Sequence, residues 1–292
     1  MMGVFKRNPI KTESGQSYTL LTSLFIVGFC FFGNVYLFAQ GNLQIEPHRI
    51  IFDGQKKTMN VNLANTGQDS ASYSISFLQY RMTDDGTYEE ITTPDPGQYF
   101  ADKNIRFFPR SVTLGPNETQ IVKIQLVNSE QLQAGEYRSH LYFRALPKQK
   151  ALGEEVKPKD TSSISIRIVP IFGISIPVLI RVGESTTTLN FSDLRLEKNS
   201  NGGESLLLTV HRSGNMSAIG DIVITHIDAT GKEVKIGALE GIVIYTPNLL
   251  RRFKIDLDNK PSIDMTKGRI RVVFDSKLGA NIVKQAEAEL AL

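Results

Sequence analysis

The stretch ISIRIVPIFGISIPVLIRV, residues 164–182, has an apolar residue at every even position from Ile164 to Ile180. Alternation with a period of two is typical of a β-strand that has one face in an apolar environment. A strand of this length would extend more than about 50 Å, whereas ordinary strands have about 5–6 residues. One face of a sandwich cannot cover such a stripe. We therefore expect residues 174–180 to pack in the protein's own core and residues 164–172 to project as an apolar edge.

The same stretch has a second interpretation. Pro170 has no backbone N–H and belongs on an edge or at a bend, so the stretch could bend at Pro170 and Gly173 into two ordinary strands, or pack wholly inside the molecule. Proteins usually protect exposed apolar edges from pairing with other chains. Here only Arg167 and the charged residues 148–160 could give such protection. An unguarded edge favours pairing with another protein, through backbone hydrogen bonds and alternate side chains. Both interpretations remain open at this point.

Most of the remaining sequence also alternates with a period of two, and turn residues separate the alternating runs. Short runs of this kind predict an all-β protein made of antiparallel sandwiches. The turn Asp84-Asp85-Gly86 predicts a hairpin, and residues 280–292 fit either a short helix or a final strand. The clearest apolar positions are Met59, Val61 and Leu63; Val122, Ile124 and Leu126; Leu206, Leu208 and Val210; Phe253, Ile255 and Leu257; and Ile270, Val272 and Phe274.

The N-terminus predicts export. Lys6, Arg7 and Lys11 precede an apolar run over residues 18–38, and Ala39 offers a cleavage point for a signal peptide of residues 1–39. An uncleaved membrane anchor is the alternative, since the run is close to the ~20 residues that span a bilayer. We then expect two domains, residues 41–182 and residues 183–292, joined by a short hinge near Val182. A cleaved leader predicts a periplasmic protein.

The amino-acid composition excludes several classes of function from what we expect. The 292 residues carry a net charge of +3, and removal of the leader leaves 30 basic and 29 acidic residues, so nucleic acid is not an expected partner. The only cysteine, Cys30, lies in the leader, which leaves no disulfide and no thiolate metal site. The four histidines lack metal-ligand spacing, and no nucleophile elbow, phosphate loop or dinucleotide motif occurs. We expect no enzyme, no cofactor, no metal and no small-molecule substrate.

Several stretches, in order and at similar spacing, resemble the PapD-like family of periplasmic pilus chaperones. The resemblance covers the whole first domain and, more loosely, the second. It implies two immunoglobulin-like β-sandwich domains, the first of which has a long donor strand. The matching stretches are PHRIIFDG (residues 47–54), MNVNLAN (59–65), PRSVTLGP (109–116), QIVKI (120–124), EYRSHLYF (136–143) and, in the second domain, HRSGN (211–215).

The resemblance also implies site residues. Arg49 matches the family's arginine that grips the terminal carboxylate of a pilus subunit, although a surface ion pair is the alternative for any arginine. Pro177 stands where the family has a second anchor, a lysine, so that second contact to the carboxylate is missing. Arg181 matches a basic residue at the family's hinge. The donor stripe is Ile164, Ile166, Ile168 and Phe172, with Pro170 in place of an expected aliphatic residue.

The resemblance therefore implies a chaperone that binds pilin-like subunits by donor-strand complementation for assembly at the outer membrane. Whether an outer-membrane usher receives the subunit is left open by the sequence. The rival function is an envelope structural or adhesive sandwich protein that assembles with itself through the same strand.

Overall fold

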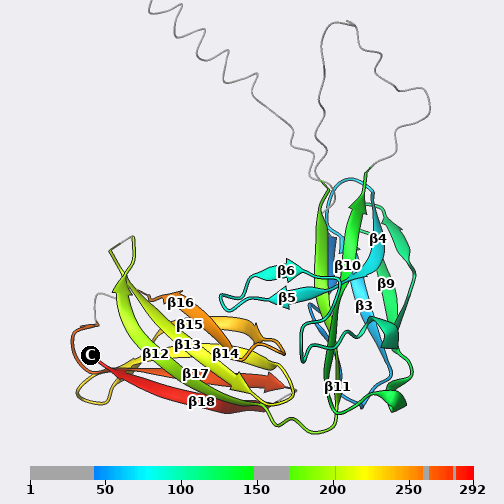
Figure 1. The fold of residues 1–292 in the computed structure, drawn as a ribbon. Helices are drawn as coiled ribbons and strands as arrows, with labels where there is room; N and C mark the ends of the chain where they lie inside the picture. Colours follow the sequence, from blue (N-terminus) through cyan, green and yellow to red (C-terminus); the bar gives the residue numbers. More distant parts are fainter. Residues whose placement is uncertain (1–42, 148–170, 201, 259–262, 279–280) are drawn as a thin grey trace, which may run out of the picture. The chain divides into compact units, whose positions relative to one another are not determined.

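The computed structural model describes residues 43–147, 171–200, 202–258, 263–278 and 281–292 (Figure 1). Strands make up almost all of the regular structure in these ranges, together with two short 3₁₀ helices, η1 (Asp102–Asn104) and η2 (Ser129–Gln131). Within the described ranges, no helix is long and apolar enough to cross a membrane. The predicted leader and its cleavage after Ala39 lie outside the described residues.

The first sandwich has two facing sheets. One sheet has the order β1-β3-β9-β7 and the other has the order β2-β11-β10-β4-β8. The inward side chains of both sheets form one apolar core that runs from Ile45 to Ile180. The strands are β1 (Leu43–Glu46), β3 (Thr58–Asn65), β9 (Thr119–Leu126), β7 (Ile105–Phe108), β2 (Ile50–Phe52), β11 (Gly173–Val182), β10 (Gly135–Leu146), β4 (Ala71–Leu78) and β8 (Ser111–Leu114).

The chain changes sheets near its start. β1 pairs with β3 in one sheet, whereas β2, four residues later, pairs with β11 in the other. Between β4 and β7, the short hairpin of β5 (Tyr80–Met82) and β6 (Tyr88–Glu90) forms a two-stranded sheet of its own. The predicted hairpin turn at residues 84–86 is therefore confirmed.

The second sandwich has the sheets β12-β13-β16 and β15-β14-β17-β18. A separate apolar core fills the space between them, from Leu189 to Phe274. Of the two structures that fitted residues 280–292, a short helix or a final strand, the chain forms the strand, β18. The strands are β12 (Thr188–Lys198), β13 (Glu204–Ser213), β16 (Leu250–Asp256), β15 (Glu233–Ile244), β14 (Ala218–Ile227), β17 (Arg269–Leu278) and β18 (Asn281–Ala291).

The predicted fold class, all-β with two immunoglobulin-like sandwiches, is confirmed. Outside residues 164–182, every position named above as one of the clearest apolar positions is buried except Met59, which is half-buried at the margin of the first core. Period-two alternation identified the core because each of these strands has one face against the opposite sheet. The exact domain limits, residues 41–182 and 183–292, remain a prediction.

Candidate functional site

In the described part of the chain, β11 has a neighbouring strand along its whole length on one side but along only three residues on the other. β10 pairs antiparallel with it from Gly173 to Val182 without a register shift. β2 pairs parallel with it only at Val178, Leu179 and Ile180. Within the described ranges, no strand pairs with residues 173–177 on the β2 side. We call residues 173–177 the open edge, and it exists because the chain before β2 has crossed to the other sheet.

The side chains beside the open edge are apolar and exposed. Phe172 is 60% exposed, Ile171 42% and Ile174 41%, whereas Ile176 is only 3% exposed. The predicted packing of residues 174–180 in the core is therefore wrong at Ile174, because β2 does not reach far enough to cover that side of it. Phe172 of the donor stripe lies in the exposed group, and Ile164, Ile166 and Ile168 lie outside the described residues.

Arg49 lies where the open edge ends. It directly precedes Ile50, which pairs with Val178, so Arg49 is level with Pro177 in the parallel register. The side chain is half-buried, and its Nε is buried without a hydrogen-bond partner in the described part of the chain. A guanidinium N–H in this state is free to donate a hydrogen bond to a carboxylate oxygen.

Pro177 faces His140 across the β10–β11 ladder. The His140 ring packs edge-on against Tyr80, with ring centroids 4.9 Å apart, and near Tyr88 at 5.9 Å. Burial, together with the charge of Arg138, lowers the pKa of His140 to about 3. The imidazole is consequently neutral at physiological pH, and the position opposite Pro177 supplies no second positive charge.

A buried arginine lies two residues before His140. The Arg138 side chain stacks on the Tyr245 ring at 4.0 Å and donates from Nη2 to the carbonyl oxygens of Tyr80 and Thr246, at 3.2 and 3.5 Å. Burial lowers the pKa of this guanidinium and raises that of the Tyr245 phenol, while the charges of Arg138 and Arg49 act on Tyr245 in the opposite direction. Arg49 and Arg138 thus both lie close enough to Tyr245 for their charges to act on its phenol.

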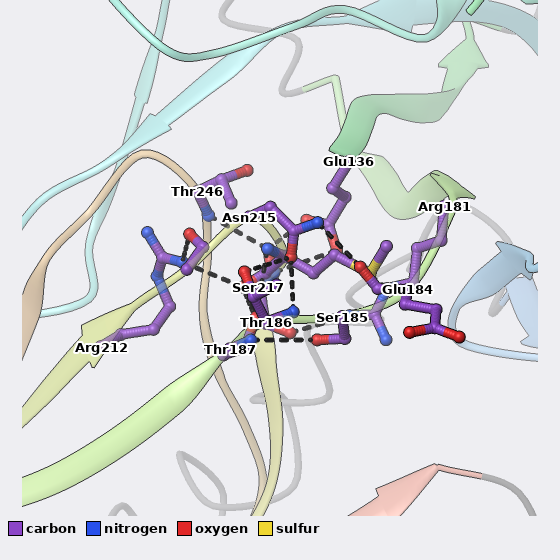
Figure 2. A network of polar contacts seen from close by, with 12 residues as sticks. Glu136, Arg181, Glu184, Ser185, Thr186, Thr187, Arg212, Asn215, Ser217 and Thr246 are labelled. Atoms are coloured by element: carbon purple, nitrogen blue, oxygen red, sulfur yellow. Dashed lines mark hydrogen bonds and ion pairs between the residues drawn. The ribbon is translucent and has the colours of Figure 1, made fainter. Parts of the chain in front are cut away.

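Arg181, the predicted hinge residue, joins a polar network at the end of β11 (Figure 2). Its Nε forms an ion pair with Glu136 Oε2 at 2.9 Å, and its Nη2 donates to the Ser217 carbonyl at 2.8 Å. Ser217 donates to Glu136 from both its backbone N–H and its hydroxyl, and the hydroxyl accepts from the Thr246 N–H at 3.0 Å. The network therefore links β10 and β11 of the first sandwich to residues of the second.

The segment between β11 and β12 is held by the same region (Figure 2). Asn215 donates to the Glu184 carbonyl at 2.9 Å and accepts from the Thr186 N–H at 2.9 Å. Thr187 donates to the Met216 carbonyl at 2.7 Å. These bonds fix the connection that the sequence predicted as a short hinge.

The β5–β6 hairpin also contacts the second sandwich. Asn248 donates to the Met82 carbonyl at 2.8 Å, and the Arg252 N–H donates to the Asp84 carbonyl at 2.7 Å. The Met82 side chain is buried in a small apolar cluster with Leu179 and Tyr245. The odd-numbered face of β11 is therefore covered at Leu179, which the sequence pattern did not reveal.

The sequence analysis proposed Arg49 and Arg181 as site residues and did not single out Glu136, Arg138 and His140, which lie beside them. A usable signal was present, since these three ionisable side chains occupy alternate positions of one strand whose other face carries Leu141 and Phe143. In the part of the chain that the structure describes, no group of histidine, cysteine and acidic side chains is arranged to hold a metal ion.

No protein-family model matches the chain, and no curated protein matches it. Similar solved structures were found. Among them are chaperones described with fimbriae or with a pilin. The YadV chaperone is 13% identical, with 86% of this chain and 99% of that chain covered and a TM-score of 0.43. The class 5 fimbriae chaperone CfaA is 16% identical, covering 86% and 98%, with a TM-score of 0.41. The Salmonella enterica SafB chaperone, solved with the SafA pilin, is 11% identical, covering 86% and 96%, with a TM-score of 0.40.

Proposed function

We propose that this protein is a periplasmic chaperone that captures an incomplete immunoglobulin-like pilus or fimbrial subunit by lending it a β-strand for assembly at the outer membrane. The protein acts by binding and is not an enzyme. The observation that carries the proposal is the open edge of β11, flanked by the exposed side chains of Ile171, Phe172 and Ile174. Export to the periplasm is supported by the predicted leader of residues 1–39.

The free energy of subunit binding requires more contacts than the exposed side chains of the described residues provide. Full burial of Ile171, Phe172 and Ile174 contributes about 1.5–3 kcal/mol for each side chain. Association and ordering cost roughly 4–15 kcal/mol. Capture therefore needs a backbone ladder along β11 and further apolar contacts, which the predicted donor stripe at Ile164, Ile166 and Ile168 would supply.

Arg49 supplies the end point of the bound strand in this proposal. A strand that pairs along the open edge reaches the start of β2, where the buried Arg49 Nε has no partner in the described ranges. A terminal carboxylate at that position forms a charge-assisted hydrogen bond, which is stronger than a neutral one. Arg181 acts through Glu136 and Ser217 as a brace between the sandwiches.

The decisive experiment is co-expression with a recombinant fibre subunit, an immunoglobulin-like domain that lacks its last strand. We expect Ile174→Asp to reduce the recovered complex at least tenfold, because a carboxylate would be buried in the subunit's core. The melting temperature should not change, since Ile174 is exposed in the free protein.

Ile121→Asp is the matched control, because Ile121 is 53% exposed on β9 in the opposite sheet. Equal recovery with both variants would contradict strand lending. Stable oligomers of the purified protein at micromolar concentration, detected by light scattering and abolished by Ile174→Asp, would favour self-assembly through the same edge.

A further inference from the structure

The direction of the β11 backbone groups follows from one hydrogen bond and the register. The Ala145 N–H donates to the Phe172 carbonyl at 2.9 Å, directly across the β10–β11 ladder. In an antiparallel pair, hydrogen-bonded and non-hydrogen-bonded positions alternate. Because the register from Gly173 to Val182 is continuous, the even residues of β11 bond to β10 and the odd residues point their N–H and C=O groups away from it.

The odd residues meet two different surroundings. Leu179 lies in the three-residue stretch that β2 covers, so its backbone groups face β2. Gly173 and Ser175 lie in the open edge, where Gly173 is exposed and Ser175 is half-buried. Their two N–H and two C=O groups are the backbone positions of the open edge at which a second strand can form a ladder.

Pro177 is the odd residue between these two stretches. A proline has no N–H, and within sheets it is confined to edges, strand starts and bulges. Here its missing N–H faces the side on which no strand of the described ranges lies beside it, so the β10–β11 ladder stays intact through Pro177. The last N–H donor before β2 therefore belongs to Ser175.

We propose that Gly173 and Ser175 provide the backbone ladder for the subunit strand and that Pro177 ends this ladder. Because the bound strand meets no N–H at Pro177, its end is received by the Arg49 side chain, with no cation at position 177 of β11 beside it. This inference rests on the proposed function and specifies its register. It also accounts for Pro177, which the sequence comparison left as a missing anchor.

The test is Ser175→Pro, which removes the last donor of the open edge. Pro177 demonstrates that β11 accepts a proline at an odd position, so we expect the melting temperature to be unchanged. We expect recovery of the co-expressed subunit to fall at least tenfold. Ile176→Pro is the opposite case, because it removes an N–H that bonds to β10, and it should lower the melting temperature.

Ser175 also lies within hydrogen-bonding reach of the Tyr80 hydroxyl. Tyr80→Phe removes that contact while it leaves the Ser175 N–H in place, and capture should be unchanged. If Ser175→Pro captures the subunit as well as the unaltered protein does, the proposed register is wrong and strand lending stands. If the unaltered protein captures no subunit, the proposed function itself is wrong.

Hydrogen exchange in the free protein gives an independent measurement. We expect the amide protons of Gly173 and Ser175 to exchange at least 100-fold faster than those of Ile174 and Ile176, which bond to β10. Equal protection of all four amides would mean that the open edge is already paired, and it would overturn the inference without any subunit being present.

Discussion

At the residue scale, the environment of Arg49 separates a binding role from a structural one. Its side chain is half-buried, but its Nε has no hydrogen-bond partner in the described ranges. Arg181, by contrast, uses its guanidinium on Glu136 and Ser217. An arginine that contributes to folding is expected to be paired, because a buried unpaired donor costs about 1–3 kcal/mol.

We therefore expect Arg49→Ala to weaken subunit capture at least tenfold and to leave the melting curve unchanged. Co-purification and thermal unfolding measure the two effects separately. Arg106→Ala is the control, since Arg106 is exposed on β7 in the opposite sheet. A loss of stability as large as the loss of capture would make Arg49 a structural residue.

At the same scale, the sequence pointed to Arg49 and Arg181 only through a resemblance, and it did not distinguish their surroundings. Alternation indicates which face of a strand meets the core, but not what covers the other face. Arg138 and His140 are polar and occupy the second face of β10, so the pattern alone favoured exposure. Both are buried, because residues of the β5–β6 hairpin and Tyr245 cover them.

At the element scale, the β5–β6 hairpin depends on Gly86. Gly86 has φ of +87°, a conformation that side chains disfavour, and a Cβ there would lie 2.2 Å from the Arg251 guanidinium. Asp85 accepts hydrogen bonds from the Thr83 hydroxyl and the Thr87 backbone and side chain, which lowers its pKa to about 2. The turn is thus specified by its own residues and by the arginine packed on it.

We predict that Gly86→Ala destabilises the protein by about 1–3 kcal/mol, from backbone strain and from displacement of Arg251. Gly54→Ala is the matched control, because Gly54 has φ of +90° but no neighbouring atom within 4 Å. Urea unfolding of both variants isolates the contribution of the Arg251 contact. Equal destabilisation would show that this contact adds nothing.

The positions of the strands were predicted well, whereas the points at which their side chains enter the core were predicted poorly. Residues 174–180 were expected to pack in the core as part of a strand, and β11 covers them. Its core-facing part begins at Ile176 and not at Ile174, because that limit is set by where β2 begins and not by the hydrophobicity of β11 itself. Such a limit depends on a strand more than 100 residues away in sequence and has no local signal.

At the scale of the whole molecule, Glu136 is the residue on which the link between the sandwiches depends. Its side chain is fully buried and pairs with Arg181 and Ser217. Removing one partner of a buried ion pair typically costs about 3–5 kcal/mol, because the other charge is left uncompensated. An exposed pair contributes roughly 0–1 kcal/mol.

Glu136→Gln should therefore lower the free energy of unfolding by several times the effect of Glu289→Gln. Glu289 forms a comparable ion pair with Arg269, at 3.1 Å, but this pair is exposed on the second sandwich. Calorimetry of the two variants measures the difference. Indistinguishable melting curves would mean that the Glu136 pair does not stabilise the link.

The point at which the chain passes from one sheet to the other, between β1 and β2, decides how much of the β11 edge stays without a neighbouring strand. If β2 began four residues earlier in the same register, it would extend beside residues 174–177 and complete its own sheet. The backbone groups of such a domain would all be paired along this edge, and a strand of another protein could not add to it. Because β2 begins only at Ile50, the sandwich keeps one incomplete sheet edge that another chain can complete.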